Sequence, residues 1–197
     1  MRNYDGPIMP RIIAGDFRGR RLSTPAEATR PTADRVREAI ASMLGARMDI
    51  VDAHVLDLYA GTGALALEAL SRGAASAVLV EADRRAASVV RENIAVCGAQ
   101  GRARVVNRTV SSYLAAPGQR FDLVFADPPY ALSADEITAM LAALPPHLAD
   151  GAWVVLERAA RSDEPRWPAT LDPVSVKNYG DTVVTLAAAV PDGGSAE

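Results

Sequence analysis

The sequence is poor in the side chains that build cross-links and metal sites. It contains one cysteine, Cys97, and two histidines, His54 and His147, among 197 residues. A single cysteine forms neither an internal disulfide nor a cysteine-based zinc cluster, and we expect a reducing, cytoplasmic setting. Neither histidine has a carboxylate or a cysteine at ligand spacing, so we predict no metal site.

Long apolar runs are also missing. A membrane-spanning helix needs about 18 or more apolar residues in a row, and no such run occurs. Residues 1–10 lack the apolar stretch of a secretory signal. Hydrophobic residues still make up 49% of the chain, which is enough for a buried core and argues against disorder. We expect a flexible tail at 1–9, a basic N-terminal extension at 10–47, one main domain at 48–190 and a disordered tail at 191–197.

Lysine is nearly absent, and arginine carries the positive charge. Residues 1–47 contain nine arginines and five acidic residues, a balance of +4, so the rest of this chain of net charge −3 carries −7. A basic segment on an acidic body indicates an anionic partner such as nucleic acid. A solvated charged surface is the alternative interpretation. The candidates for contact with nucleic acid are Arg11, Arg18, Arg20, Arg21, Arg35 and Arg37.

The apolar pattern alternates between strands and helices from residue 53 onward. We predict strands at 54–58, 77–81, 103–107, 121–126 and 152–156, helices at 63–71, 83–96, 110–114 and 134–144, and a terminal hairpin of 174–177 and 182–187. Nearly continuous apolar strands predict a doubly wound, mostly parallel α/β sheet covered on both faces. Ahead of it we expect a basic hairpin around Gly15 and Gly19, and a helix that Thr32 begins and Gly45 ends.

Ligands of such sheets bind beyond the carboxyl ends of the strands. Gly61 and Gly63 follow the first strand, and Glu81 ends the second, where its carboxylate can accept both hydroxyls of a ribose. This pair predicts an adenosine-type cofactor. Gly61-x-Gly63-x-x-Ala66 also fits the dinucleotide fingerprint, so on that pattern alone NAD competes evenly. Asp57, just before the loop, would repel a pyrophosphate and suits the cationic end of S-adenosylmethionine; its alternative role is to cap the loop amides.

The fourth strand ends in Asp127-Pro128-Pro129-Tyr130. Two prolines stiffen the loop and remove two donors, which leaves a carboxylate and carbonyl oxygens as acceptors. Acceptors that bind the hydrogens of an exocyclic amine can draw the nitrogen lone pair out of conjugation with the base. The carboxylate also offsets the positive charge that develops on nitrogen. Tyr130 offers a stacking surface for a base that has left its stack. A plain proline turn, with Tyr130 filling a gap, is the alternative.

Longer segments resemble a known family. Asp-Leu-Tyr-Ala-Gly-Thr-Gly-Ala-Leu at 57–65, Leu-Glu-Ala-Leu-Ser-Arg-Gly-Ala at 67–74 and Asp-Pro-Pro-Tyr at 127–130 resemble class I methyltransferases that modify exocyclic amines. Arg-Pro-Thr at 30–32, Asp-Arg-Val-Arg-Glu at 34–38 and Arg-Ile-Ile-Ala-Gly at 11–15 narrow the resemblance to the RsmD family of bacterial 16S ribosomal RNA guanine-N2 methyltransferases. It covers about 10–188 and implies methyl transfer from S-adenosylmethionine to N2 of a guanine.

The resemblance also implies a set of site residues. The cofactor residues would be Asp57, Tyr59, Ala60, Gly61, Gly63, Glu81, Ala82, Thr109, Val110, Arg30 and Thr32, and the catalytic residues Asp127, Pro128, Pro129 and Tyr130. Thr109 stands where an acidic residue is expected near the adenine amino group. The implied partner is small-subunit ribosomal RNA, free or within the assembled or assembling subunit, and we expect a monomer without a membrane partner.

Three rival functions remain open. One is another amino methyltransferase, which would act on adenine in DNA or on a protein amide, because the Asp-Pro-Pro-Tyr motif is shared with adenine-N6 DNA enzymes. The second is a nicotinamide-dependent oxidoreductase, against which Asp57 and the proline-rich loop argue. The third is a non-catalytic RNA-binding module that keeps a relic cofactor pocket, against which the intact 127–130 loop argues.

Overall fold

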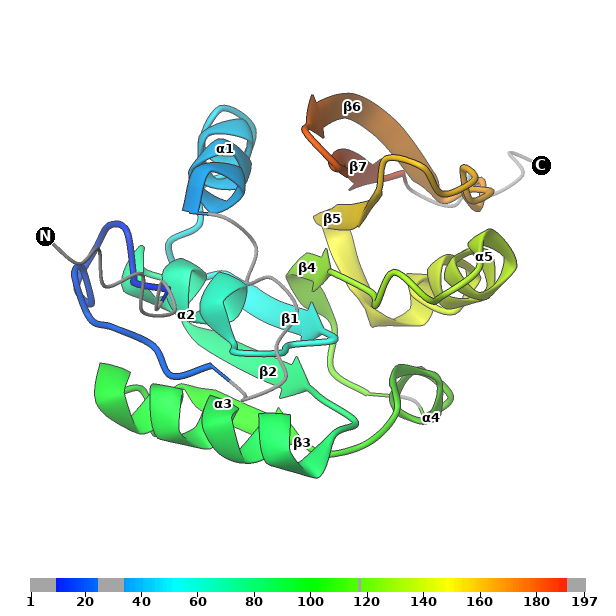
Figure 1. The fold of residues 1–197 in the computed structure, drawn as a ribbon. Helices are drawn as coiled ribbons and strands as arrows, with labels where there is room; N and C mark the ends of the chain where they lie inside the picture. The colour runs from blue at the N-terminus through cyan, green and yellow to red at the C-terminus, as the bar shows by residue number, and fades with distance from the viewer. Residues whose placement is uncertain (1–9, 25–33, 117, 191–197) are drawn as a thin grey trace, which may run out of the picture.

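The computed structural model describes residues 10–24, 34–116 and 118–190 (Figure 1). Within these ranges the elements are α1 (Asp34–Gly45), β1 (His54–Leu58), α2 (Ala64–Ser71), β2 (Ser76–Val80), α3 (Arg84–Cys97), β3 (Ala103–Val106), α4 (Val110–Leu114), β4 (Phe121–Ala126), α5 (Ala134–Ala142), the 3-10 turn η1 (Pro145–His147), β5 (Leu148–Ala159), β6 (Leu171–Tyr179) and β7 (Thr182–Ala189). The strands form one sheet in the order β3-β2-β1-β4-β5-β7-β6. β1 to β5 are parallel, and β7 runs antiparallel to both β5 and β6.

Helices cover both faces of the sheet. On one face Ile40 of α1, Leu67 of α2 and Val90 of α3 join a single buried cluster. On the other face Leu114 of α4 and Leu141 of α5 join a second cluster. The predicted doubly wound arrangement with an antiparallel terminal hairpin is therefore confirmed.

The register of the parallel strands aligns their carboxyl ends. Leu58 of β1 lies opposite both Val80 of β2 and Ala126 of β4. Val106 lies opposite Val80, and Leu156 of β5 lies opposite Ala126. The residues that follow these five positions therefore share one edge of the sheet, which we call the carboxyl edge.

The predicted strands at 54–58 and 121–126 match β1 and β4 residue for residue. β5 is longer than the predicted 152–156. It starts directly after η1 and continues to Ala159, because pairing with β7 extends to that residue.

The predicted basic hairpin at the N-terminus is present in a short form. Arg11 and Arg21 make one antiparallel bridge, and backbone hydrogen bonds join Ile12 to Arg20 and Leu22 to Pro10 on either side of it. Longer strands do not form within 10–24, and neighbouring amides bond to α2. The Glu68 carboxylate accepts from the amides of Ile13 at 2.8 Å and Ala14 at 3.1 Å.

A close backbone approach holds the turn of this segment against α2. Gly15 has φ +79°, and a Cβ atom there would lie 1.8 Å from the carbonyl oxygen of Ser71. The next amide, that of Asp16, donates to the same carbonyl at 2.8 Å. Only glycine fits this position without moving the helix. Ile12 and Phe17 are buried in the same cluster as α1, α2 and α3, so the basic extension packs onto the main body.

None of the helices in the part of the chain that the structure describes is long and apolar enough to cross a membrane.

Candidate active site

The glycine loop between β1 and α2 is built from unusual backbone angles. Tyr59, Gly61 and Gly63 all have positive φ, at 60°, 57° and 76°. Gly63 begins α2, and a Cβ atom there would lie 2.9 Å from Cδ2 of Leu79. The amide of Ala60 donates to the carbonyl of Val80 at 3.0 Å, which fastens the loop to the end of β2. Close packing thus fixes the loop at the carboxyl edge.

Glu81 follows β2 and contacts this loop. One carboxylate oxygen accepts from the amide of Gly61 at 2.9 Å, and the other from the amide of Asp83 at 2.8 Å. Each oxygen keeps a further lone pair for a ligand hydroxyl. The side chain of Asn107 donates to the carbonyls of Glu81 at 2.8 Å and Ala82 at 3.0 Å, which holds the backbone of this corner.

Asp57 is buried beneath the loop and is only 2% exposed. Its carboxylate accepts from the amide of Ala66 in the first turn of α2 at 3.2 Å. Burial is the largest effect on its pKa and raises it well above the usual value, against the lowering effect of that hydrogen bond; Asp127 and Glu81 raise it further. This contact corresponds to the alternative role of Asp57, the capping of backbone amides near the start of α2.

The Asp127–Tyr130 loop leaves the neighbouring strand at the same edge. The amide of Asp127 reaches the carbonyl of Leu58 at 3.5 Å. Pro128 is buried and Pro129 exposed, and the carbonyl of Pro129 accepts from the amide of Leu132 at 2.9 Å, which closes the turn. Tyr130 is 57% exposed, and its hydroxyl lies 3.4 Å from the hydroxyl of Thr182 on β7.

The residues expected near the adenine follow β3. Thr109 caps α4, since its hydroxyl accepts from the amide of Ser112 at 3.2 Å, and Val110 is buried. Tyr59 is half-buried and packs against the second cluster. Burial raises the pKa of its phenol, and Glu136 adds to the shift. Their contacts with a cofactor remain predictions.

Asn93 is a site residue that the sequence reasoning missed. It is fully buried on α3, and its side-chain amide donates to the carbonyls of Thr62 at 2.9 Å and Ser23 at 3.0 Å. Its oxygen accepts from the amide of Ser23 at 2.7 Å. Asn93 therefore connects the glycine loop to the N-terminal extension. The signal for it was a polar residue at helical spacing between Val90 and Cys97 on the apolar face of a predicted helix.

Glu157 is the second missed residue. It is 3% exposed on β5, and it lies beside Asp127 because Leu156 pairs with Ala126. A carboxylate directly after an apolar strand is the same signal that identified Glu81 and Asp127.

One of the arginines proposed for RNA contact must be withdrawn. Arg37 is 1% exposed, and its Nη2 donates to the carbonyl of Arg11 at 2.7 Å and to the carboxylate of Asp34 at 2.5 Å. It holds α1 against the N-terminal segment and is covered by both. The charged run that contains Arg37 predicted an exposed side chain, whereas α1 packs with Arg37 facing the interior.

The other proposed RNA contacts are more accessible: Arg11, Arg18, Arg21 and Arg35 are exposed and Arg20 is half-buried. Arg20 lies over the ring of Phe17, 5.0 Å from its centroid, and donates to the carbonyl of Val96 at the end of α3. Arg20 therefore lies at the carboxyl-terminal end of α3, the end farther from Glu81. Arg30 and Thr32 lie outside the described residues.

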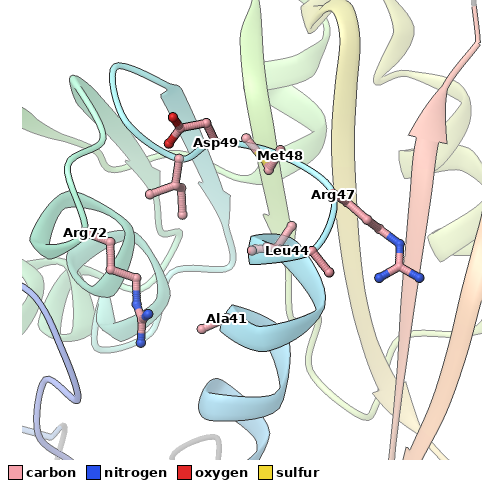
Figure 2. A pocket seen from close by; sticks show the side chains of 9 residues that line it. Ala41, Leu44, Arg47, Met48, Asp49 and Arg72 are labelled. Atoms are coloured by element: carbon pink, nitrogen blue, oxygen red, sulfur yellow. The ribbon is translucent and has the colours of Figure 1, made fainter.

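A hollow of about 520 Å³ lies elsewhere, between the end of α1, the segment leading to β1 and Arg72 (Figure 2). It is lined by 41, 44–50 and Arg72, and it includes no predicted site residue. Because this segment precedes β1, the hollow lies toward the opposite edge of the sheet from Glu81 and Asp127. Within the described ranges, no group of three or more His, Cys, Asp or Glu side chains is placed to hold a metal ion.

Comparisons with known proteins match this geometry. The model of the family described as conserved hypothetical protein 95 matches residues 10–188. Ribosomal RNA small subunit methyltransferase D of Escherichia coli K12 is 44% identical over 168 residues, which cover 85% of this chain and 83% of the relative. The solved structure of yhhF from Escherichia coli is 39% identical with a TM-score of 0.81, and the match covers 92% of this chain and 98% of that one.

A second solved structure, that of a hypothetical protein from Thermus thermophilus, is 34% identical with a TM-score of 0.76 and covers 90% of this chain and 98% of its own. The sheet is that of class I methyltransferases, as predicted. The chain therefore belongs to the conserved hypothetical protein 95 family, the RsmD family.

Proposed function

We propose that this protein transfers a methyl group from S-adenosylmethionine to the exocyclic N2 amine of a guanine in small-subunit ribosomal RNA. The observation that carries the proposal is the strand register. It places the Gly61–Glu81 contact and the Asp127–Tyr130 loop on adjacent strands at one edge. The name of the Escherichia coli relative, ribosomal RNA small subunit methyltransferase D, supports the choice of substrate.

The residues that follow β1 and β2 at the carboxyl edge fit the proposed cofactor. Glu81 can accept the ribose hydroxyls while it keeps its bonds to Gly61 and Asp83. A Cβ atom at Gly61 would meet nothing closer than 3.8 Å, so the loop surface there is open to a ligand. When bound, S-adenosylmethionine supplies an electrophilic methyl group on a cationic sulfur.

The residues that follow β4 at the carboxyl edge fit an exocyclic amine as substrate. The Asp127 carboxylate accepts a hydrogen bond from the amine and offsets the positive charge that develops on nitrogen. The stiff Pro128–Pro129 backbone fixes the carboxylate and the nearby carbonyl acceptors before the substrate arrives. The exposed ring of Tyr130 receives the base after it leaves its stack. No side-chain nucleophile is required, because the amine nitrogen itself would take the methyl group and then release one proton, for which the Asp127 carboxylate is an adjacent acceptor.

The RNA backbone would contact the arginines of the N-terminal segment. Arg11, Arg18, Arg21 and Arg35 are exposed, and each can neutralise a phosphate. A substrate that contacts these arginines as well as the Asp127–Tyr130 loop must extend beyond the target base. The proposal therefore favours a structured RNA over a free nucleoside as substrate.

The test is methyl transfer from tritiated S-adenosylmethionine to small-subunit ribosomal RNA, to DNA and to ribosomal protein in parallel. The proposal expects label in the RNA alone. Label in DNA or protein would identify another amino methyltransferase, and label in none of them would refute a methyltransferase acting on these classes. Isothermal titration with NAD and with S-adenosylhomocysteine tests the alternative of a nicotinamide-dependent oxidoreductase. The proposal expects only S-adenosylhomocysteine to bind.

A further inference from the structure

The carboxyl edge carries a carboxyl group that the chemistry above does not use. Glu157 of β5 is the neighbour of Asp127 in the sheet. Side chains alternate along a strand, so Asp127 points to the same face as Phe125, and Glu157 to the same face as Val155. Phe125 and Val155 both belong to the cluster beneath α1, α2 and α3. The two carboxyl groups therefore face the same side from adjacent strands, which are about 4.8 Å apart.

The described surroundings of Glu157 offer its carboxyl group few polar partners. The residue is 3% exposed, and its Oε1 has no hydrogen-bond partner among the residues that the structure describes. Arg37 of α1 is the described cation that lowers the pKa of Glu157. Its Nη2 is engaged by Asp34 and Arg11, and its Nε and Nη1 have no partner within the described ranges. Glu157 and Arg37 thus lie in one buried region without forming a hydrogen bond to each other.

Among the residues that the structure describes, the charged groups that act on Glu157 are two carboxyl groups and one arginine. Burial raises the pKa of Glu157 well above the usual value, Asp127 and Asp57 raise it further, and Arg37 lowers it. An ionised Glu157 would place a poorly bonded charge in the interior beside two other carboxylates, which is strongly unfavourable. A protonated carboxyl group removes that charge and gains an O–H donor.

Resting on the proposed function, we propose that Glu157 is a positioning residue for methyl transfer, a protonated carboxyl group that donates a hydrogen bond to Asp127. Two adjacent carboxyl groups share their protons unequally when their environments differ. The more buried Glu157 keeps the proton, and half-buried Asp127 keeps the negative charge. The donated hydrogen bond then orients the charged carboxylate toward the amine.

The first experiment measures the charge state of Glu157 without any reference to catalysis. A carboxyl group that is harder to ionise in the folded chain makes the fold lose stability as pH rises above its unfolded pKa. Glu157→Gln removes this loss. We therefore expect the thermal unfolding temperature of Glu157→Gln, relative to the unaltered chain, to rise between pH 5 and pH 8.5. Glu92→Gln, at an exposed position of α3, is the matched control and should show no such trend.

The second experiment measures methyl transfer to small-subunit ribosomal RNA across the same pH range. Glutamine still offers an N–H donor to Asp127, so kcat of Glu157→Gln at pH 7 should stay within about threefold of the unaltered chain, whereas Glu157→Ala should lose about tenfold or more. KM for S-adenosylmethionine should not change in either variant. At alkaline pH kcat of the unaltered chain should fall as Glu157 ionises, and Glu157→Gln should lack that fall.

Two results would overturn the proposal. A lower unfolding temperature of Glu157→Gln at pH 8 would mean that Glu157 is ionised and stabilised by Arg37. Equal kcat and equal pH profiles for the glutamine, alanine and unaltered chains would mean that Glu157 positions nothing. Failure of the unaltered chain to methylate RNA would instead refute the proposed function, while the unfolding data would still decide the charge state.

Discussion

Replacement of Asn93 by alanine would release the glycine loop from the N-terminal extension. The buried side chain makes three hydrogen bonds, two with the backbone of Ser23 and one with the carbonyl of Thr62. At about 1 kcal/mol of net stabilisation for each bond, Asn93→Ala should lower the free energy of unfolding by about 3 kcal/mol. A domain with an ordinary stability of ~5–15 kcal/mol remains folded after that loss.

Urea unfolding followed by circular dichroism measures this change, and isothermal titration with S-adenosylhomocysteine measures its effect on the site. Thr62 lies between Gly61 and Gly63, so we expect weaker binding together with lower stability. Asn178→Ala, at an exposed position of β6, is the control and should change stability by less than about 0.5 kcal/mol. An Asn93→Ala variant of unaltered stability, or one that is destabilised but binds the ligand equally well, would refute the connection.

Other perturbations address the remaining residues. Glu81→Ala should weaken both S-adenosylmethionine and S-adenosylhomocysteine by about 1.5–3 kcal/mol in titration calorimetry, the range for bonds to a charged group; unchanged affinities would remove Glu81 from the site. Tyr130→Phe should keep most of the methylation activity, whereas Tyr130→Ala should lose about 1–3 kcal/mol of base binding; equally poor variants would show that the hydroxyl, not stacking, matters. Changing Arg18, Arg20 and Arg21 together to alanine should flatten the dependence of log affinity on log salt by up to about three units in filter binding. An unchanged slope would mean that the RNA is held elsewhere.

Much of the fold follows from local sequence patterns. Apolar runs bounded by glycine, proline or aspartate predicted β1 and β4 without error, because buried parallel strands are continuous in hydrophobicity. The placement of Gly61 and Glu81 at the same edge of the sheet followed from a general rule about the carboxyl ends of strands. That rule needs no knowledge of side-chain packing.

The errors share a different cause, which is long-range contact. The N-terminal hairpin is shorter than the pattern suggests, and Glu68 and Ser71 of α2 bind amides of its turn, which no local pattern reports. Arg37 is buried because α1 packs with that face inward, although its charge predicted exposure. The spacing of Asn93 marked a polar residue on an apolar helix face, but its role could be recognised only once Ser23 and Thr62 were known to lie beside it.

Asp127 offers the most direct measurement of the central claim. Small-subunit ribosomal RNA is incubated with S-adenosylmethionine and either the unaltered chain or Asp127→Ala, then digested, and N2-methylguanosine is quantified. Asp172→Ala, at an exposed position of β6, is the control. The account predicts N2-methylguanosine with the unaltered and control chains and a rate lower by about 10²-fold or more with Asp127→Ala, at nearly unchanged affinity for S-adenosylhomocysteine. Near-normal methylation by Asp127→Ala, or methylation of a different atom, would contradict it.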